Sequence, residues 1–184
     1  MLKLIITALL SFLLFACGEG LEEFDGLEIP SPVPNSVYYN YEIFYSDSGL
    51  TQVKMAGRVL EQHAASQESG GRDHMKDSVH LWFYDNDMKV QSEMIADSAI
   101  RGRETGYMEA FGNVIVYNEK GEQLKTEHLI WDEKRGKIIS NTKVAIIKKT
   151  QIIYGDGLIS DQNFIDYEIK NPHGELLIDN ESEQ

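Results

Sequence analysis

The side chains most able to do chemistry in this chain are its histidines and carboxylates. The chain has five histidines, which are His63, His74, His80, His128 and His173. No two of them have the H-E-x-x-H spacing that brings two imidazoles to one zinc ion. Asp73, His74 and Asp77 are metal-binding residue types, but they occur in a polar, glycine-containing stretch that is typical of a solvated loop. We therefore predict no metal site.

Motifs for catalysis or nucleotide binding are missing from the sequence. Neither G-x-x-x-x-G-K-[ST] nor G-x-S-x-G occurs. Asp85-Asn86-Asp87 begins like a calcium loop, but Lys89 stands where a ligand is needed and Ala96 stands where such loops have Glu. Acidic residues are so frequent, at 30 in the chain, that scattered carboxylate pairs carry little information. We expect no enzymatic activity and no cofactor.

The one cysteine, Cys17, is the residue whose setting points to a definite modification. An apolar run from Leu4 to Phe15 follows Lys3. It is shorter than the roughly 20 residues that a membrane-spanning helix needs, and it fits a signal peptide. The run ends in Leu14-Phe15-Ala16-Cys17, which resembles a lipobox. We expect cleavage before Cys17, attachment of acyl chains such as palmitate to it, and stable anchoring on a membrane.

The remaining sequence divides into three segments. Residues 17–36 are predicted to form a lipidated tether, because the alternate prolines from Pro30 to Pro34 favour an extended backbone. Residues 37–174 are predicted to form one folded domain, and residues 175–184 an acidic tail. The formal net charge of −13 argues against nucleic acid as a partner, since a protein that binds phosphate backbones needs a basic face.

Apolar and polar residues alternate with period two along most of this domain. Val79, Leu81 and Phe83 alternate with His80, Trp82 and Tyr84, and one strand face is expected to hold Tyr39, Tyr41, Ile43 and Tyr45. Such alternation predicts half-buried strands. Glycine- and aspartate-containing turn signals separate the runs, including Gly155 and Gly157, and Gly112 is expected at a bend or bulge. The stretch from Ala64 to Asp77 is predicted as a loop.

A weak internal repeat underlies the strands. Similar apolar runs begin at Val79, Val114 and Val144, which are 35 and 30 residues apart, and each opens a strand, a turn and a second strand. Stacked hairpins of this kind predict an all-β fold, either a sandwich or an open β-jelly roll, with about ten or more strands.

Two stretches have a more specific pattern. The first runs from Met108 to Asp132 and contains A-x-G-x-V followed by G-x-x-L-x-T-E-x-L-x-W-D. The second, from Ile153 to Asp161, contains G-x-G-x-x-S-D, and the final strand closes at Gly174. In this order and spacing the motifs resemble the LptC family, the periplasmic membrane-tethered component of lipopolysaccharide transport, over roughly Tyr41 to Gly174. The related LptA shares much of the pattern.

The resemblance implies a folded-leaf β-jelly roll of the OstA/LptA type, whose apolar interior receives the acyl chains of lipopolysaccharide. It implies three partners: lipopolysaccharide, the permease subunits of an inner-membrane ABC transporter, and an LptA-like bridge protein. Many family members carry an uncleaved transmembrane helix, whereas this chain has the Cys17 motif. We expect a lipid anchor on the periplasmic face of the inner membrane, with the outer membrane as the alternative.

Candidate residues follow from these expectations. The lipid-groove candidates are Leu81, Phe83, Val114, Val116, Leu124 and Ile146. The last strand is predicted at Phe164 to Ile169, and the candidates for strand-to-strand docking of a partner are Phe164, Tyr167 and Ile169. From residues alone, an ordinary sandwich core is favoured over a lipid lumen as the explanation of the apolar strands, and the resemblance reverses that preference.

Basic residues are concentrated between Lys134 and Lys149, a stretch without any acid. Lys148 and Lys149 are therefore candidates for contact with lipid phosphates, with protection of exposed strand edges as the alternative. A different function also fits the residues, namely an envelope lipoprotein that binds glycans or scaffolds an assembly. An outer aromatic cluster containing Tyr38, Tyr39, Tyr41 and Trp82 would favour sugar stacking, and a lumenal position would favour lipid.

Overall fold

A computed structural model describes residues 33–65 and 70–176. These residues form an antiparallel sheet of thirteen strands and no helix. The strands are β1 (Ser36–Asp47), β2 (Leu50–His63), β3 (Arg72–Tyr84), β4 (Val90–Ala96), β5 (Ser98–Gly102), β6 (Tyr107–Asn118), β7 (Gln123–Asp132), β8 (Lys137–Ser140), β9 (Val144–Ile147), β10 (Gln151–Gly155), β11 (Gly157–Asp161), β12 (Tyr167–Lys170) and β13 (His173–Leu176). The predicted all-β jelly roll of repeated antiparallel hairpins is confirmed.

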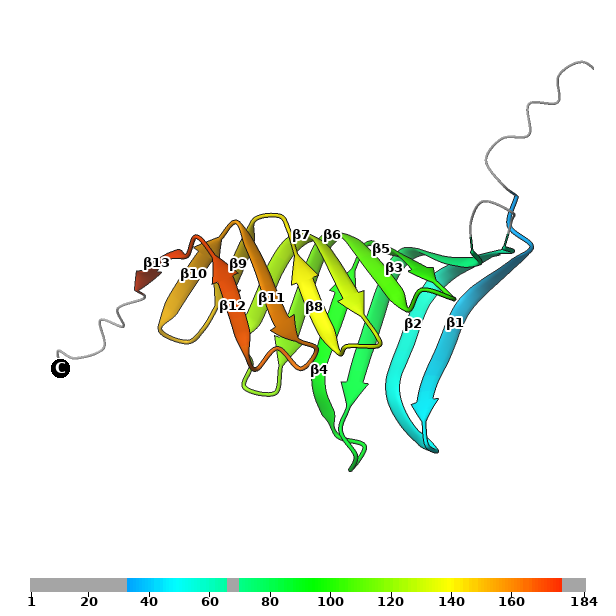
Figure 1. The fold of residues 1–184 in the computed structure, drawn as a ribbon, viewed down its shortest axis with the longest axis horizontal. Coiled ribbons are helices and arrows are strands. Elements are labelled where there is room, and N and C mark those ends of the chain that lie inside the picture. The colour runs from blue at the N-terminus through cyan, green and yellow to red at the C-terminus, as the bar shows by residue number, and fades with distance from the viewer. Residues whose placement is uncertain (1–32, 66–69, 177–184) are drawn as a thin grey trace, which may run out of the picture. The chain divides into compact units, whose positions relative to one another are not determined.

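The sheet is folded over because its long strands change partners halfway along their length. β3 pairs with β5 through Arg72–Met75 and with β4 through Val79–Tyr84. β6 pairs with β5 and then β4, and β7 pairs with β8 and β9. We call the half that holds β4, β9, β10 and β13 leaf one, and the half that holds β5, β8, β11 and β12 leaf two. Figure 1 shows the successive strands side by side, from the β1–β2 hairpin to β12 and β13.

The line along which the strands bend, here called the crease, is built from small polar residues and glycine. Asn40, Asp77, Ser78, Gly112, Asn113 and Asn171 all have positive φ there. The backbone N–H of Ser78 donates to Asp97 O at 2.9 Å, and that of Asp97 donates to Gly112 O at 3.0 Å. Asn113 Nδ2 donates to Asp97 Oδ2 at 2.8 Å. Side chains that tolerate left-handed backbone therefore set where each strand turns from one leaf to the other.

Gly112 is the crease position where glycine is needed most. Its φ is +74°, and a Cβ atom there would lie 2.5 Å from Asp97 Oδ2. The pairing of β6 with β7 shifts register between Phe111 and Val114, so the predicted bulge at this glycine is confirmed. Gly155 and Gly157, predicted at a turn, instead flank the corner at which the chain leaves β10 and enters β11.

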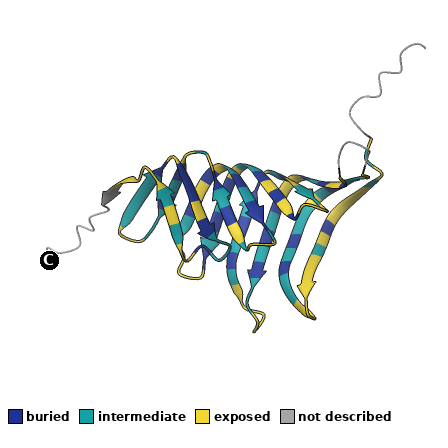
Figure 2. Ribbon diagram, in the orientation of Figure 1, coloured by how far each residue is buried: buried dark blue, intermediate teal, exposed yellow. Residues whose placement is uncertain are grey.

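Each unit of the internal repeat corresponds to one passage of the chain around the crease. Val79, Val114 and Val144 each stand just after a corner, at the start of a leaf-one segment, and they are 0%, 1% and 3% exposed. All three point inward because the corner resets the alternation of the strand. Figure 2 shows buried and exposed residues alternating along the strands on both sides of the fold.

One hydrophobic core lies between the leaves. It joins Met55 and Leu81 of leaf one with Leu60 and Met75 of leaf two. Phe83 of leaf one and Trp131 of leaf two meet edge to face, with ring centroids 5.1 Å apart. Within the described ranges, the structure contains no helix with the length and apolar character needed to cross a membrane.

Two sequence predictions about strand bounds and one about a strand face are wrong. Ala64 to Asp77 is not a loop throughout, because Arg72–Asp77 begins β3, where the apolar pattern is hidden by a buried Asp73. Phe164 to Ile169 is not one strand, since β12 begins at Tyr167 and β13 continues to Leu176. Tyr39 and Tyr41 do not share one strand face. Tyr39 is 74% exposed and Tyr41 is 6% exposed, because Asn40 between them has φ +53° and interrupts the alternation. Cys17, the signal peptide and most of the predicted tether lie outside the described residues.

Candidate functional site

The candidate site is an apolar row that crosses leaf one from strand to strand. Cross-strand pairing places the following residues side by side: Ile43, Met55, Leu81, Met94, Val116, Leu124, Ile146 and Ile153. The six central members are 0% or 1% exposed, while Ile43 and Ile153 at the two ends are half-buried. Ile153 pairs with Gly174 of β13, whose lack of a side chain leaves this end uncovered. The row therefore runs across eight strands and is accessible at its ends.

All six lipid-groove candidates are brought together by this arrangement. Leu81, Val116, Leu124 and Ile146 belong to the row, and Phe83 and Val114 lie beside it on the same strands. Each is 0% or 1% exposed and belongs to the single core cluster. Their neighbours on the opposite face, such as Ile115, are half-buried on the outside.

Methionine is frequent among the residues that line the interior. Met55, Met75, Met94 and Met108 are each 0% or 1% exposed. The unbranched thioether adopts many shapes and fills irregular spaces, so methionine-rich surfaces adapt to ligands of variable form. The interior is thus closed in this structure but lined by side chains that repack readily.

A short loop closes the side of the fold opposite the crease. This closing loop, residues 161–166, is held by Asp161, whose Oδ1 accepts hydrogen bonds from the backbone N–H groups of Ile165 at 2.9 Å and Asp166 at 2.8 Å. Phe164 takes φ +54°, is 0% exposed and stacks on Tyr167 with centroids 5.2 Å apart. Phe164 was predicted to lie on the last strand as a docking candidate, and this is wrong, because it lies in a turn that directs its ring into the core.

The closing loop is bonded to both leaves. Ser92 Oγ of β4 donates to Gln162 O at 2.8 Å, and Asn118 Nδ2 of β6 donates to Phe164 O at 2.9 Å. From leaf two, Trp131 Nε1 donates to Gln162 Oε1 at 3.2 Å. These bonds hold the rims of the leaves together over the interior, so access from this side requires the loop to move.

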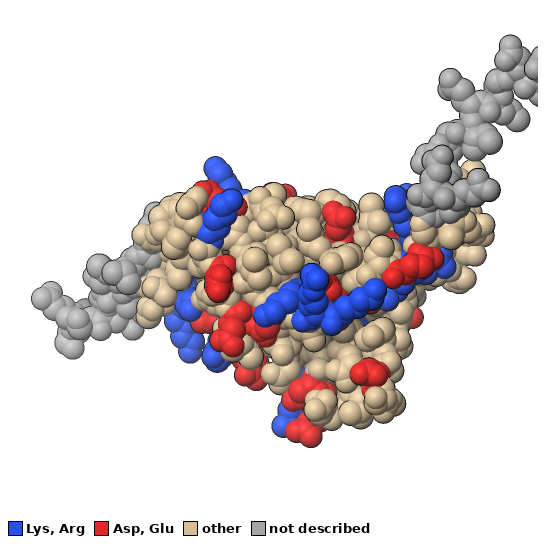
Figure 3. All heavy atoms as spheres, viewed as in Figure 1, with Lys and Arg blue, Asp and Glu red and all other residues tan. Residues whose placement is uncertain are grey.

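Lys148 and Lys149, the phosphate-contact candidates, have different surroundings. Lys148 Nζ lies 3.4 Å from Glu122 Oε1 and 5.2 Å from the centroid of the Tyr167 ring. The interaction with the Tyr167 side chain, followed by that with Glu122, raises the pKa of Lys148. Lys148 is therefore already paired across the rims, whereas Lys149 is exposed in the turn between β9 and β10. Figure 3 shows basic side chains in a band across the visible face, with acidic side chains beside it.

The partner-strand candidates Tyr167 and Ile169 lie on β12, which pairs with β11 and ends one path of the sheet. At the other end β1 pairs with β2 alone and exposes large apolar side chains, including Tyr39 at 74% and Phe44 at 57%. Sequence reasoning did not single out β1 as an edge, although its run of aromatic residues on both faces was the available signal. The aromatic set proposed for sugar stacking is not brought together, because Tyr41 is buried inside and Trp82 stacks on His80 on the outer face at 3.6 Å.

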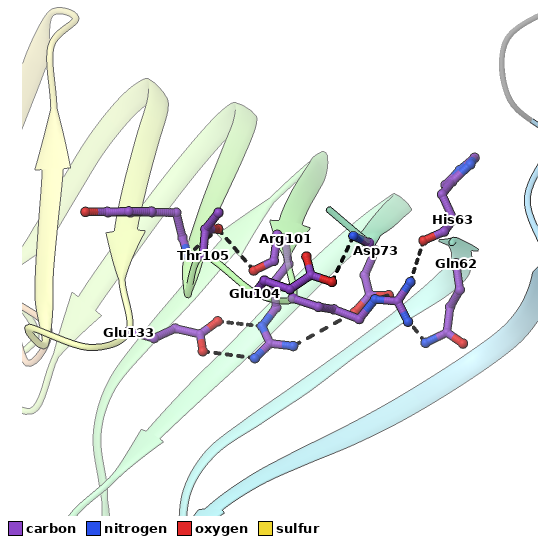
Figure 4. A network of polar contacts seen from close by, with 11 residues as sticks. Gln62, His63, Asp73, Arg101, Glu104, Thr105 and Glu133 are labelled. Atoms are coloured by element: carbon purple, nitrogen blue, oxygen red, sulfur yellow. Dashed lines mark hydrogen bonds and ion pairs between the residues drawn. The ribbon is translucent and has the colours of Figure 1, made fainter. Parts of the chain in front are cut away.

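A buried ionic network is the site feature that the sequence did not reveal. Arg101 donates to Glu133 through Nε at 2.5 Å and Nη2 at 2.9 Å, and its Nη1 lies 3.9 Å from Asp73 Oδ2. Arg103 Nε lies 3.5 Å from Asp73 Oδ1. The bond to Glu133 raises the pKa of Arg101 despite its burial. Figure 4 shows how Asp73 of β3, Arg101 of β5 and Glu133 of the turn after β7 converge. The partners are separated by tens of residues, so no local motif marks them.

Tyr41 supplies a prediction for pH dependence. Its ring packs over Gly57, its hydroxyl has no hydrogen-bond partner, and burial raises its pKa to about 12. A raised pKa means that the folded state favours the neutral phenol, so stability is complete below pH 10 and falls as the pH rises towards 12. Tyr41→Phe is expected to equal the parent protein or exceed it by about 1 kcal/mol at pH 7, and to remove this alkaline loss. Urea unfolding at pH 7 and above pH 10 measures both effects.

Tyr39→Phe is the matched control, because the Tyr39 side chain is exposed. Tyr39→Phe should leave the free energy of unfolding equal to that of the parent protein both at pH 7 and above pH 10. Weaker stability of Tyr41→Phe at pH 7 would show that the hydroxyl has a favourable partner and would contradict the assignment.

Comparison with protein-family models gives no match for this chain, and comparison with curated proteins gives none either.

Proposed function

We propose that this chain is a membrane-tethered periplasmic carrier of lipopolysaccharide. In this proposal it receives the acyl chains from the permease subunits of an inner-membrane ABC transporter and passes them to an LptA-like bridge protein. Lipid on Cys17 is the proposed tether, which holds the folded domain at the periplasmic face of the inner membrane. The chain itself performs no reaction, and the energy comes from the transporter.

The apolar row across leaf one is the observation that supports the proposal. Exposing an acyl chain of about twelve carbons to water costs on the order of 10 kcal/mol, so a carrier needs a continuous apolar path rather than a catalytic group. The row from Ile43 to Ile153 is such a path, and its half-buried members stand at the two ends, on the edge strand β1 and beside the edge strand β13. The free edge of β1 and the short strands β12 and β13 suit strand addition by partners.

The test is photo-crosslinking from a reactive residue placed at Val116, in membranes that contain the transporter and lipopolysaccharide. We expect an adduct with lipopolysaccharide that increases when ATP is supplied. The matched control is the same reactive residue at Ile115, the next position on the same strand, which faces outward and should give no adduct. An absent adduct at Val116 in folded protein, or equal adducts at both positions, would refute the proposal.

A further inference from the structure

A cluster of three metal-binding side chains lies on the outer face of the sheet, away from the apolar row. Glu61 and His63 are two residues apart on β2, so both point to the same face, and His74 of β3 pairs directly with Glu61. Leu60 and Met75, next to them in sequence, point into the core. One ligand atom from each of the three residues lies within 4.8 Å of the other two.

His63 is the member whose surroundings are incomplete. Both of its ring nitrogens are buried, and neither has a hydrogen-bond partner among residues 33–65 and 70–176. Buried polar groups in proteins are nearly always paired, so an imidazole with two unpaired nitrogens indicates a missing ligand. The ring centroid of His74 lies 4.4 Å away, and the nearest carboxylate oxygen, Glu61 Oε2, lies 3.7 Å from His63 Nε2. The neighbouring groups thus surround the His63 ring without bonding to its nitrogens.

We propose that Glu61, His63 and His74 bind a divalent transition-metal ion, with Zn²⁺ as the expected species. Two imidazoles and one carboxylate are a common three-residue zinc ligand set, with the fourth position left to water or to another molecule. Imidazole ligands favour zinc and its neighbours over Mg²⁺ and Ca²⁺, which prefer oxygen alone. Burial, and then the charge of His63, lower the pKa of His74, which favours the neutral imidazole that coordinates metals.

Two cationic side chains near the cluster determine which contacts must change when a metal ion binds. Lys76 Nζ bonds to Glu61 Oε2 at 2.7 Å, and Arg72 pairs with His63 across the strands. The Lys76 side chain is half exposed, so it is free to turn into solvent when a metal ion takes the carboxylate. Because the ligands come from two adjacent strands, a bound ion would join the end of β2 to β3. The inference is independent of the function proposed above.

The experiment is equilibrium dialysis of the full-length protein against Zn²⁺ alone, with Co²⁺ as a spectroscopic probe of four-coordinate geometry. We expect one equivalent of Zn²⁺ and an increase in Tm of about 5 °C at saturating metal. His63→Ala and His74→Ala should each weaken binding about tenfold or more, and Glu61→Gln should weaken it less. Loss of the visible Co²⁺ bands in both histidine variants is expected.

His80→Ala is the matched control, because His80 lies on the same strand and the same outer face and pairs with Glu93 at 2.8 Å without a second histidine. It should keep the full equivalent of Zn²⁺. Binding that survives in His63→Ala, or that is lost equally in His80→Ala, would overturn the proposal, as would absence of binding in the parent protein. If His63→Ala does not fold, His74→Ala decides the same question.

Discussion

Phe164→Ala is expected to lose about 3 to 5 kcal/mol of the free energy of unfolding and, in the protein that remains folded, to take up lipid more readily. The loss follows from removing a ring that is 0% exposed and stacked on Tyr167. The gain in uptake follows from its position, because Phe164 belongs to the closing loop that joins the rims of the two leaves. Urea unfolding measures the first effect, and binding of a fluorescent fatty acid measures the second.

Ile138→Ala separates access from general destabilisation. Ile138 of β8 is 1% exposed and belongs to the same core, but it lies outside the closing loop. It should lose a comparable free energy without the increase in fatty-acid binding. If both variants bind the probe equally, Phe164 is an ordinary core residue and the loop does not control entry to the interior.

Arg101→Met is expected to destabilise the protein by about 3 kcal/mol or more, since it leaves the buried Glu133 carboxylate without its partner and removes one of the two arginines beside Asp73. The side chains of Glu133 and Asp73 are 8% and 4% exposed. The larger part of the effect is the desolvation of the unpaired Glu133 rather than loss of favourable attraction. Chemical denaturation at pH 7 and low salt gives the value directly.

Arg103→Met, in the turn directly after β5, provides the comparison. Arg103 contacts the same Asp73, but its side chain is 38% exposed, so water replaces much of the interaction. A change under about 1 kcal/mol is expected. Equal losses in the two variants would show that burial does not govern this network.

The sequence predicted the features that depend on neighbouring residues. Period-two alternation located the strand at Val79 to Phe83, and small polar residues and glycine marked the corner at Gly112. The spacing of Val79, Val114 and Val144 indicated a repeated unit, which the structure explains as successive passages around the crease. The period-two alternation also assigned all six groove candidates correctly to the inward face, because alternation fixes which residues share one side of a strand.

The features that the sequence missed depend on contacts between distant segments. Asp73 made the start of β3 resemble a loop, since its burial is explained by contacts with Arg101 on β5 and Arg103 in the following turn. Phe164 was assigned to a strand because nothing local shows that Asp161 folds the preceding turn. His63 and His74 lie on different strands, so their approach appeared only with the register of β2 and β3.

The pairing of the strands also determines in what order this domain unfolds. No cross-strand pair joins residues more than 30 positions apart, whereas the bond from Ser92 to Gln162 in the closing loop spans 70. Among the described residues the sheet is therefore close to one-dimensional, with each layer stabilised by its immediate neighbours, as in a solenoid. Unfolding should begin at the terminal layers and advance inward. A strand added by a partner at β1 or β12 would act as one more layer, so assembly would slow the fraying of the ends without altering the middle.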